Sequence, residues 1–309
     1  MNQLRAHSFD EWEAVMSNAY VPVAIEPLPE SSAEFTGMIT HSTIDDIEFT
    51  LLRSTGQRVI RTERLISRSS TEVLYVGICT EGSGRIQQDG RLAELERPGE
   101  MVFVDSRRPN WWESDGDHEQ LIVQVPVAAL ERGGWTQPTT PAALTVTPDS
   151  AGGLVAEYLR DVARAQETDP AAAARLGAHV LPLLTSALTM TAGELPNPES
   201  GKALARLQAL TVMRRRCHDP DVTVDDIAAE CLLSRSALYR LFDRGPGVLA
   251  RLWTMRVERA KTLLGADLTR ALSAVAAASG FRTERQFYRV FRDVTGTTPA
   301  QWRDSHRPG

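Results

Sequence analysis

The sequence of 309 residues has no long hydrophobic run, few cysteines and no cluster of metal-binding side chains. No stretch approaches the roughly 18 consecutive apolar residues that a membrane-spanning helix needs. The polar start, residues 1–7, lacks the apolar core of a secretory signal. The three cysteines, Cys79, Cys217 and Cys231, have no paired spacing, so neither a disulfide framework nor a zinc site is indicated. We therefore expect a reduced, cytoplasmic protein with no membrane partner.

The net charge of -6 conceals an uneven distribution of charge along the chain. Residues 202–309 contain 19 Lys and Arg against 11 Asp and Glu, whereas the first 201 residues contain 15 against 29. A basic module attached to an acidic one is typical of a phosphate-binding domain joined to a domain with another role, although two domains can also differ in charge by chance.

The first half of the chain is expected to be rich in strands. After a short helix over residues 9–19, residues 21–126 carry apolar and β-branched runs bounded by turn signals, such as 81–84 and 97–100. This spacing favours a β-sandwich or small barrel. Helical periodicity then begins near residue 150, over residues 151–166 and 170–192.

These patterns predict two domains of an α+β protein. The first is a β-barrel followed by helices over residues 1–195, and the second is an all-α domain over residues 202–309. Two prolines in a polar stretch make residues 196–201 the linker. Within the first domain, an apolar helical stripe (Leu176, Val180, Leu183, Leu184 and Leu188) is either a dimer face or the side packed on the barrel.

A helix-turn-helix unit is expected over residues 223–242. Thr223 and Ser234 are suitable N-caps for two short helices, with acidic residues in the first turn of the first helix. The polar face of the second helix carries the candidate DNA-binding residues Arg235, Ser236, Tyr239 and Arg240.

The same pattern recurs about 48 residues later, over residues 272–292. Ala228 corresponds to Ala276 and Leu233 to Phe281, and the candidate DNA-binding residues of this second copy are Thr283, Glu284, Arg285 and Arg289. Leu232 stands where the second copy has Gly280, so we expect a distorted first turn. A long helix over residues 248–264 would hold the two units apart, as two successive major grooves about 34 Å apart require.

Residues 202–309 resemble the DNA-binding domain of the AraC/XylS family of bacterial regulators. That family ends with GF, F-x-R-x-F-[KR] and G-x-[ST]-P-x-x-[YW]-R in this order. The corresponding segments are Gly280-Phe281, Phe287-Tyr288-Arg289-Val290-Phe291-Arg292 and Gly296-Thr297-Thr298-Pro299-Ala300-Gln301-Trp302-Arg303. The resemblance implies binding to double-stranded DNA and cooperation with RNA polymerase. The segment 243–248 is shorter than the commoner family version and is similar to a branch with a cupin-like sensor domain.

Residues 9–126 resemble that sensor domain in segments spread over most of their length, including 9–12, 21–23, 58–66, 87–91, 97–102 and 105–109. The resemblance implies a cupin-like barrel that holds a small organic effector, aromatic or amine-type, followed by helices used for homodimerisation. Candidate effector-binding residues are Trp111 and Trp112, with Arg61 and Tyr75 as further candidates. The alternative is a purely structural role, in which one tryptophan belongs to the barrel core and the other to the surface.

An enzymatic alternative, a cupin metalloenzyme, lacks its usual ligands. Such enzymes bind metal through two closely spaced histidines, a glutamate and a later histidine. Here only His118 lies near the barrel turns, with His41 far upstream. No cofactor and no catalytic residue is therefore expected.

The sequence thus predicts an effector-responsive transcription activator of a catabolic operon. A repressor, or a DNA-binding protein that ignores small molecules, is the main alternative, and a cupin-type enzyme is a remote one.

Overall fold

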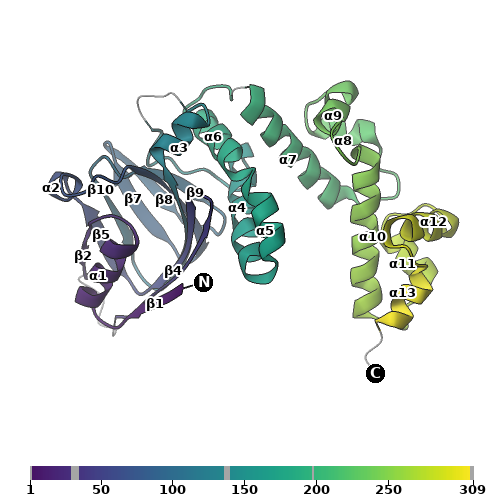
Figure 1. Ribbon diagram of the computed structural model, residues 1–309, viewed down its shortest axis with the longest axis horizontal. Helices are drawn as coiled ribbons and strands as arrows, with labels where there is room; N and C mark the ends of the chain where they lie inside the picture. The colour runs from purple at the N-terminus through teal and green to yellow at the C-terminus, as the bar shows by residue number, and fades with distance from the viewer. Residues whose placement is uncertain (1, 29–34, 136–139, 197, 307–309) are drawn as a thin grey trace. The chain divides into compact units, whose positions relative to one another are not determined.

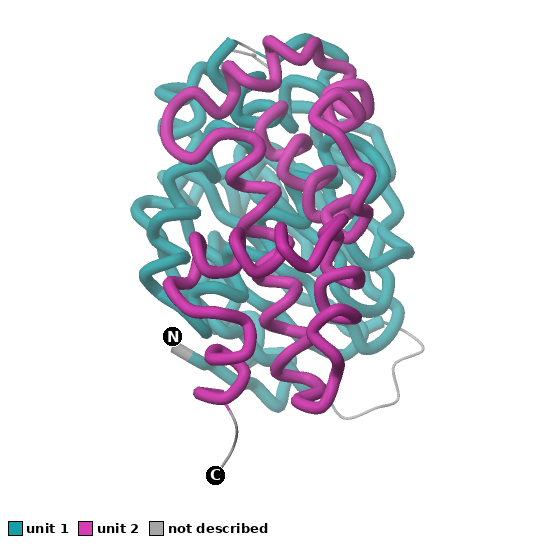
Figure 2. Tube along the Cα trace, turned by 90° about the vertical axis from the view of Figure 1, so that its right-hand side faces the viewer, with its two compact units in different colours: residues 1–204 teal, residues 205–309 magenta. Residues whose placement is uncertain are grey.

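The computed structural model describes residues 2–28, 35–135, 140–196 and 198–306, and it divides into two compact units. Unit 1 comprises residues 1–204 and unit 2 comprises residues 205–309 (Figure 2). No single helix in the described ranges is long and apolar enough to cross a membrane. One consecutive pair, α5 (Pro170–Gly177) and α6 (Val180–Thr191), is together long and apolar enough, but the two helices are bent by 48° relative to each other.

Unit 1 is built on two antiparallel sheets, as the strand pattern predicts (Figure 1). The first sheet has the order β1-β3-β4-β11-β6-β9 and the second β2-β5-β10-β7-β8. The strands of the first sheet are β1 (Asn2–Ala6), β3 (Gly37–Ile44), β4 (Ile47–Ser54), β6 (Val73–Glu81), β9 (Met101–Asp105) and β11 (His118–Pro126). Those of the second are β2 (Ala24–Glu26), β5 (Gln57–Arg61), β7 (Gly84–Gln88), β8 (Arg91–Leu95) and β10 (Asn110–Ser114).

The edge strand β1 was not predicted, because a short strand with few apolar residues is specified by its neighbour. It pairs with β3 in a register that sets Leu4 opposite Ile39. Helix α1 (Phe9–Ala19) follows and matches its predicted range. Its Trp12 is fully buried, and Nε1 donates a hydrogen bond of 2.7 Å to Oε1 of Gln57 on β5, which fixes α1 against the second sheet. A single turn, α2 (Glu63–Ile66), follows β5.

Helices follow the sheets within unit 1. They are α3 (Val127–Arg132), α4 (Ala151–Thr168), α5 (Pro170–Gly177) and α6 (Val180–Thr191). The single helix expected over residues 170–192 is broken at residues 178–179. Pro182 explains the break, because its ring is tolerated in the first turn of a helix but would clash with the carbonyl of Ala178 in a continuous one.

The apolar stripe of this region is packed inside unit 1. Val180, Leu184 and Leu188 have no exposed surface and Leu183 has 2%. Of the two readings of the stripe, the structure supports packing within the chain, so this stripe is not an open dimer face.

The segment expected to be a linker is helical from Pro198 onward. Helix α7 (Pro198–Arg216) includes residues 198–201, while Asn197 lies outside the described residues. A proline can begin a helix because the first turn needs no backbone donor, so its presence at residue 198 marks a helix start rather than a continued loop.

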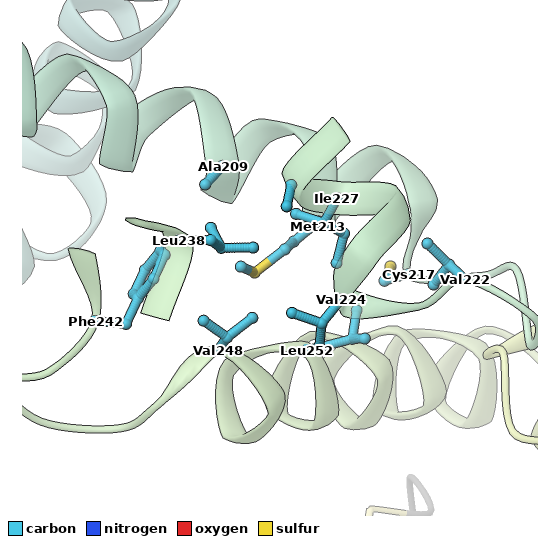
Figure 3. Packing of buried hydrophobic residues seen from close by; sticks show 11 residues of the cluster. Ala209, Met213, Cys217, Val222, Val224, Ile227, Leu238, Phe242, Val248 and Leu252 are labelled. Carbon is cyan, nitrogen blue, oxygen red and sulfur yellow. The ribbon is translucent and has the colours of Figure 1, made fainter. Parts of the chain in front are cut away.

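Unit 2 is helical throughout, as predicted, and has two hydrophobic cores. Its helices after α7 are α8 (Val224–Glu230), α9 (Arg235–Leu241), α10 (Val248–Ala266), α11 (Leu272–Ala278), α12 (Glu284–Thr295) and α13 (Pro299–Ser305). The first core joins α7, α8 and α9 to the first turns of α10, around Met213, Ile227 and Leu238 (Figure 3). The second joins the later turns of α10 to α11 and α12, around Phe287 and Phe291. Helix α10 therefore carries both cores.

Candidate DNA-binding surface and effector cavity

Helices α8 and α9 form the first helix-turn-helix unit, at the predicted position. Thr223 Oγ1 accepts a hydrogen bond from the backbone N–H of Asp226 (3.1 Å), whose carboxylate accepts the N–H of Thr223 (2.8 Å). Ser234 Oγ accepts the N–H of Ala237 at 3.1 Å and begins α9. These two caps satisfy orphan donors at the helix starts and set the boundaries of both helices.

Helices α11 and α12 form the second unit. Thr283 Oγ1 accepts the N–H of Gln286 at 3.2 Å and begins α12, and Gly296 ends it in the left-handed conformation, with φ of 77°. Helix α12 has 12 residues where α9 has seven, so the second unit presents a longer helix.

The expectation of a distorted first turn is wrong. The backbone N–H of Leu232 bonds to the carbonyl of Ala229 (3.0 Å), as that of Gly280 bonds to the carbonyl of Ala277 (3.1 Å). The next residue in each turn also forms the same hydrogen bond. The backbone N–H of Leu233 donates to the carbonyl of Ala228, and that of Phe281 donates to the carbonyl of Ala276. The two turns therefore share one geometry, because Leu232 adopts a positive φ itself.

All eight candidate DNA-binding side chains lie at the exposed starts or faces of α9 and α12. They are Arg235, Ser236, Tyr239, Arg240, Thr283, Glu284, Arg285 and Arg289. Arg235 is engaged within the protein, because its Nη1 lies 2.8 Å from a carboxylate oxygen of Asp225 and its guanidinium lies 5.8 Å from the ring centre of Tyr239. Within the described residues, Arg240, Arg285 and Arg289 take part in no ion pair, so their guanidinium groups are available to a partner.

Two arginines connect α10 and the turn between α11 and α12 to residues 217–221, the segment that precedes α8. Arg256 on α10 is 2% exposed, and its Nε and Nη2 donate to the carbonyls of Cys217 (2.9 Å) and Asp219 (2.7 Å). Arg282 donates from Nε to the carbonyl of Pro220 at 3.0 Å and pairs with Asp221. These contacts and the shared helix α10 hold α9 and α12 in one body.

A cavity lies between the two sheets of unit 1, with about 690 Å³ of empty space including its mouth. Concave sites lined mainly by apolar side chains with a few polar groups are typical places for small organic ligands to bind. Apolar side chains from both sheets form much of its wall, and α1 and the segment after it contribute Met16, Tyr20, Val21 and Val23. The other lining residues are Leu52, Gln57, Val59, Arg61, Tyr75, Gly77, Ile86, Val104, Asn110, Trp112, Gln120 and Ile122.

Three of the four candidate effector-binding residues meet at this cavity. Arg61, Tyr75 and Trp112 line it, whereas Trp111 does not. Trp111 and Trp112 are consecutive on β10, and neighbouring side chains of a strand point to opposite faces. The indole of Trp111 instead lies 4.7 Å from the guanidinium of Arg58. Trp111 was therefore wrongly grouped with the cavity residues, and the alternation of the strand separates it from them.

The sequence did not point to Tyr20, Asn110 or Gln120 as cavity residues. Tyr20 is the residue after α1, and its ring stands edge-on to that of Tyr75, with centres 5.8 Å apart. A tyrosine after a helix carries no signal of its own. The fold brings Tyr20 to the cavity because α1 and the segment after it contribute to the cavity wall.

The described residues hold no group of three or more His, Cys, Asp or Glu side chains that could bind a metal ion. His118 is buried at the start of β11, with Nδ1 3.5 Å from Oγ of Ser54. Burial lowers its pKa to about 4, so the ring is neutral at physiological pH. It does not line the cavity between the sheets.

Two family models match the chain. The AraC-binding-like domain matches residues 12–189, which contain the cavity, and a helix-turn-helix domain matches residues 227–305.

Similar proteins extend over most of the chain. The transcriptional activator NphR of a Rhodococcus species is 28% identical over 96% of this chain and 89% of its own length. An uncharacterised protein from the nit 5′ region of a Bacillus species is 29% identical over 70% of this chain and 84% of its own. The crystal structure of the AraC-like transcriptional activator CuxR aligns with a TM-score of 0.51 and 18% identity, over 84% of this chain and 95% of that one. At this low identity, the alignment with CuxR shows a similarity of fold alone.

Proposed function

The chain belongs to the AraC family of transcription regulators and is a DNA-binding transcriptional regulator, and we propose that it is an activator that responds to a small aromatic effector. The observation that carries the proposal is the cavity of the AraC-binding-like domain, whose wall combines Tyr20, Tyr75 and Trp112 with apolar side chains. Aromatic walls with a few polar groups suit a small organic ligand.

Activation is supported by the relative NphR, whose name describes a transcriptional activator. In this proposal the protein is cytoplasmic, forms a homodimer, and contacts RNA polymerase at the promoter of a catabolic operon. It carries out no catalysis and uses no cofactor.

For DNA, the proposal places α9 and α12 in two successive major grooves. The exposed faces of both helices and the rigid link through Arg256 and α10 support this arrangement, because two recognition helices must keep a fixed spacing to read one side of a duplex. A footprint on a target promoter should show two protected segments about 10 base pairs apart for each monomer. One protected segment would contradict the two-groove arrangement.

The response to an effector is tested with the full-length protein and a panel of small aromatic compounds. A compound that raises the melting temperature should also raise transcription from a reporter placed behind a bound promoter. Transcription that is higher in the absence of the compound than in its presence indicates a repressor. DNA binding with no response to any compound indicates a ligand-independent regulator.

A further inference from the structure

We infer that the cavity of unit 1 recognises its effector as a carboxylate, which Arg61 and Tyr75 bind while Trp112 and the apolar wall hold the body of the molecule. The inference rests on the proposed function of the cavity as an effector site and adds the charge of the effector to it. Four observations support it: the burial of Arg61, the absence of a counter-charge among the described lining residues, the unused donors at the wall, and the apolar remainder of the cavity.

The first observation is a buried guanidinium whose hydrogen-bond partners, among the described residues, are uncharged. Arg61 is 3% exposed, and its Nε and Nη1 donate hydrogen bonds of 2.7 Å to the backbone carbonyls of Ser106 and Pro22. These bonds fix the plane of the guanidinium at the cavity wall. Burial lowers the pKa of Arg61, but a guanidinium stays protonated at neutral pH. The cavity therefore contains a fixed positive charge.

The second observation is that no acidic side chain neutralises this charge in the described part of the chain. A buried charge is ordinarily paired, as that of Asp105 is here with Arg107 through two hydrogen bonds of 3.0 and 2.8 Å. Arg61 forms no ion pair with any residue that the structure describes, and the described lining residues include no Asp or Glu. The nearby carboxylate of Glu48 contributes to the raised pKa of Tyr20 and of Tyr75. It accepts a hydrogen bond from Gln124, however, and it does not line the cavity.

The third observation concerns hydrogen-bond donors that have no acceptor. Tyr75 Oη and Trp112 Nε1 are buried at the cavity wall, and neither has a hydrogen-bond partner among the described residues. Burial and the neighbouring Tyr20 raise the pKa of Tyr75, so its hydroxyl keeps the proton it can donate. The Tyr75 hydroxyl can donate to an ionised carboxylate, which only accepts, and the Trp112 N–H can donate to an acceptor on the body of a ligand. A ligand rich in acceptors would satisfy groups that the protein leaves unpaired.

The positions of these groups give the ligand two ends. Arg61 lies opposite Asn110 in the pairing of β5 with β10, and Trp112 is two residues further along β10, or about 7 Å at the usual rise of a strand. The charged end therefore belongs with Arg61 and Tyr75, and the body lies toward Trp112. Leu52, Val59 and Ile86 complete an apolar wall there. This pattern fits a small aromatic carboxylic acid.

The test uses matched probes that differ in charge but hardly in shape. Benzoate and phenylacetate are compared with benzamide, phenylacetamide and benzyl alcohol, by calorimetric titration and melting curves of the full-length protein. We expect at least one acid to bind, and to bind at least tenfold more tightly than its amide. An amide or alcohol that binds as tightly as its acid would overturn the carboxylate and leave the proposed effector site standing. Binding of none of these compounds, together with no response to any other aromatic compound, would overturn both.

Three variants locate the charge. Arg61→Gln should weaken binding of the acid at least tenfold and leave a neutral ligand unaffected. Because Arg61 is buried and this variant can lose stability, Tyr75→Phe provides a second test. It removes a hydroxyl with no partner within the described residues, so it should fold normally and weaken the acid several-fold. Arg58→Gln is the matched control, since it removes the same charge from the same strand outside the cavity. Retention of the acid preference in a folded Arg61→Gln or Tyr75→Phe protein, or its loss in Arg58→Gln, would refute the assignment.

Discussion

Leu232 and Gly280 occupy the same position in the turns of the two helix-turn-helix units, and both have a left-handed backbone, with φ of 56° and 83°. Their surroundings differ. The side chain of Leu232 is 94% exposed, whereas a Cβ on Gly280 would overlap the carbonyl oxygen of Cys217 and lie 3.0 Å from Nε of Arg256. The first turn thus bears only the strain of the backbone, and the second has no room for a side chain.

This difference predicts opposite effects of substitution at the two positions. Leu232→Gly should stabilise unit 2 by about 1 kcal/mol, because relief of a strain of about 1–2 kcal/mol exceeds the added chain entropy of glycine. Gly280→Ala should destabilise it by about 2–4 kcal/mol, because the strain is joined by overlap with the backbone. Calorimetry of the full chain, with hydrogen exchange to assign the transition to residues 205–309, measures both. Equal effects of the two substitutions would contradict this account.

Base readout should depend on the unpaired arginines of α9 and α12. Arginine can bond both major-groove acceptors of guanine, which gives about 1–3 kcal/mol of discrimination. Arg285→Ala should weaken binding mainly to the preferred sequence and relax the choice at one base pair. Loss of a phosphate contact would instead weaken all sequences alike and reduce the dependence on salt.

Binding across a library of sites separates these outcomes. Arg235→Ala is the matched comparison, and we expect a smaller effect on base choice because Asp225 already engages that guanidinium. Unchanged base preference in both Arg285→Ala and Arg240→Ala would refute the proposed reading faces.

The two neighbouring tryptophans should differ in their effect on the effector. A ligand at 100 times its dissociation constant adds about 2.7 kcal/mol to the stability of the domain that binds it, which is visible in a melting curve. Trp112→Ala should abolish most of that shift, because Trp112 lines the cavity, whereas Trp111→Ala should keep it. The melting temperature of each variant without ligand is the control. A shift lost in Trp111→Ala and kept in Trp112→Ala would place the site on the other face of β10.

His118 should make unit 1 less stable in mild acid. Its pKa is about 4 in the folded protein, against 6.5 for the free side chain, because burial disfavours the charged ring. Between these values the unfolded chain binds a proton that the folded chain does not, so stability is full above pH 6.5 and falls as the pH drops toward 4. The loss amounts to about 3 kcal/mol.

His118→Gln should flatten this part of the curve, since glutamine does not titrate. Denaturation of both proteins at pH 7 and pH 4.5 gives the comparison, and the lowered pKa of Asp105 acts only in stronger acid. Parallel curves for the two proteins would show that His118 does not cause the acid sensitivity.

The sequence by itself determined the architecture of the DNA-binding half. Helix starts depend on neighbours three residues away, so Thr223 and Ser234 could be recognised as caps and are confirmed as caps. Thr283 caps α12 at the corresponding position of the second copy. The repeat of the helix-turn-helix pattern and the strands that precede it could likewise be predicted, because both depend on the local spacing of apolar residues.

The tertiary structure alone decided the character of the cavity. Alternation along β10 shows that Trp111 and Trp112 face opposite ways, but not which of them faces inward, because that depends on pairing with β5 and β7. Arg61 is buried without an acidic partner in the described chain only because chain segments remote in sequence, at Pro22 and Ser106, close around it. Leu232 is tolerated because its surroundings are open. Burial, space and unpaired charge arise from contacts between residues far apart in the chain, and no local pattern encodes them.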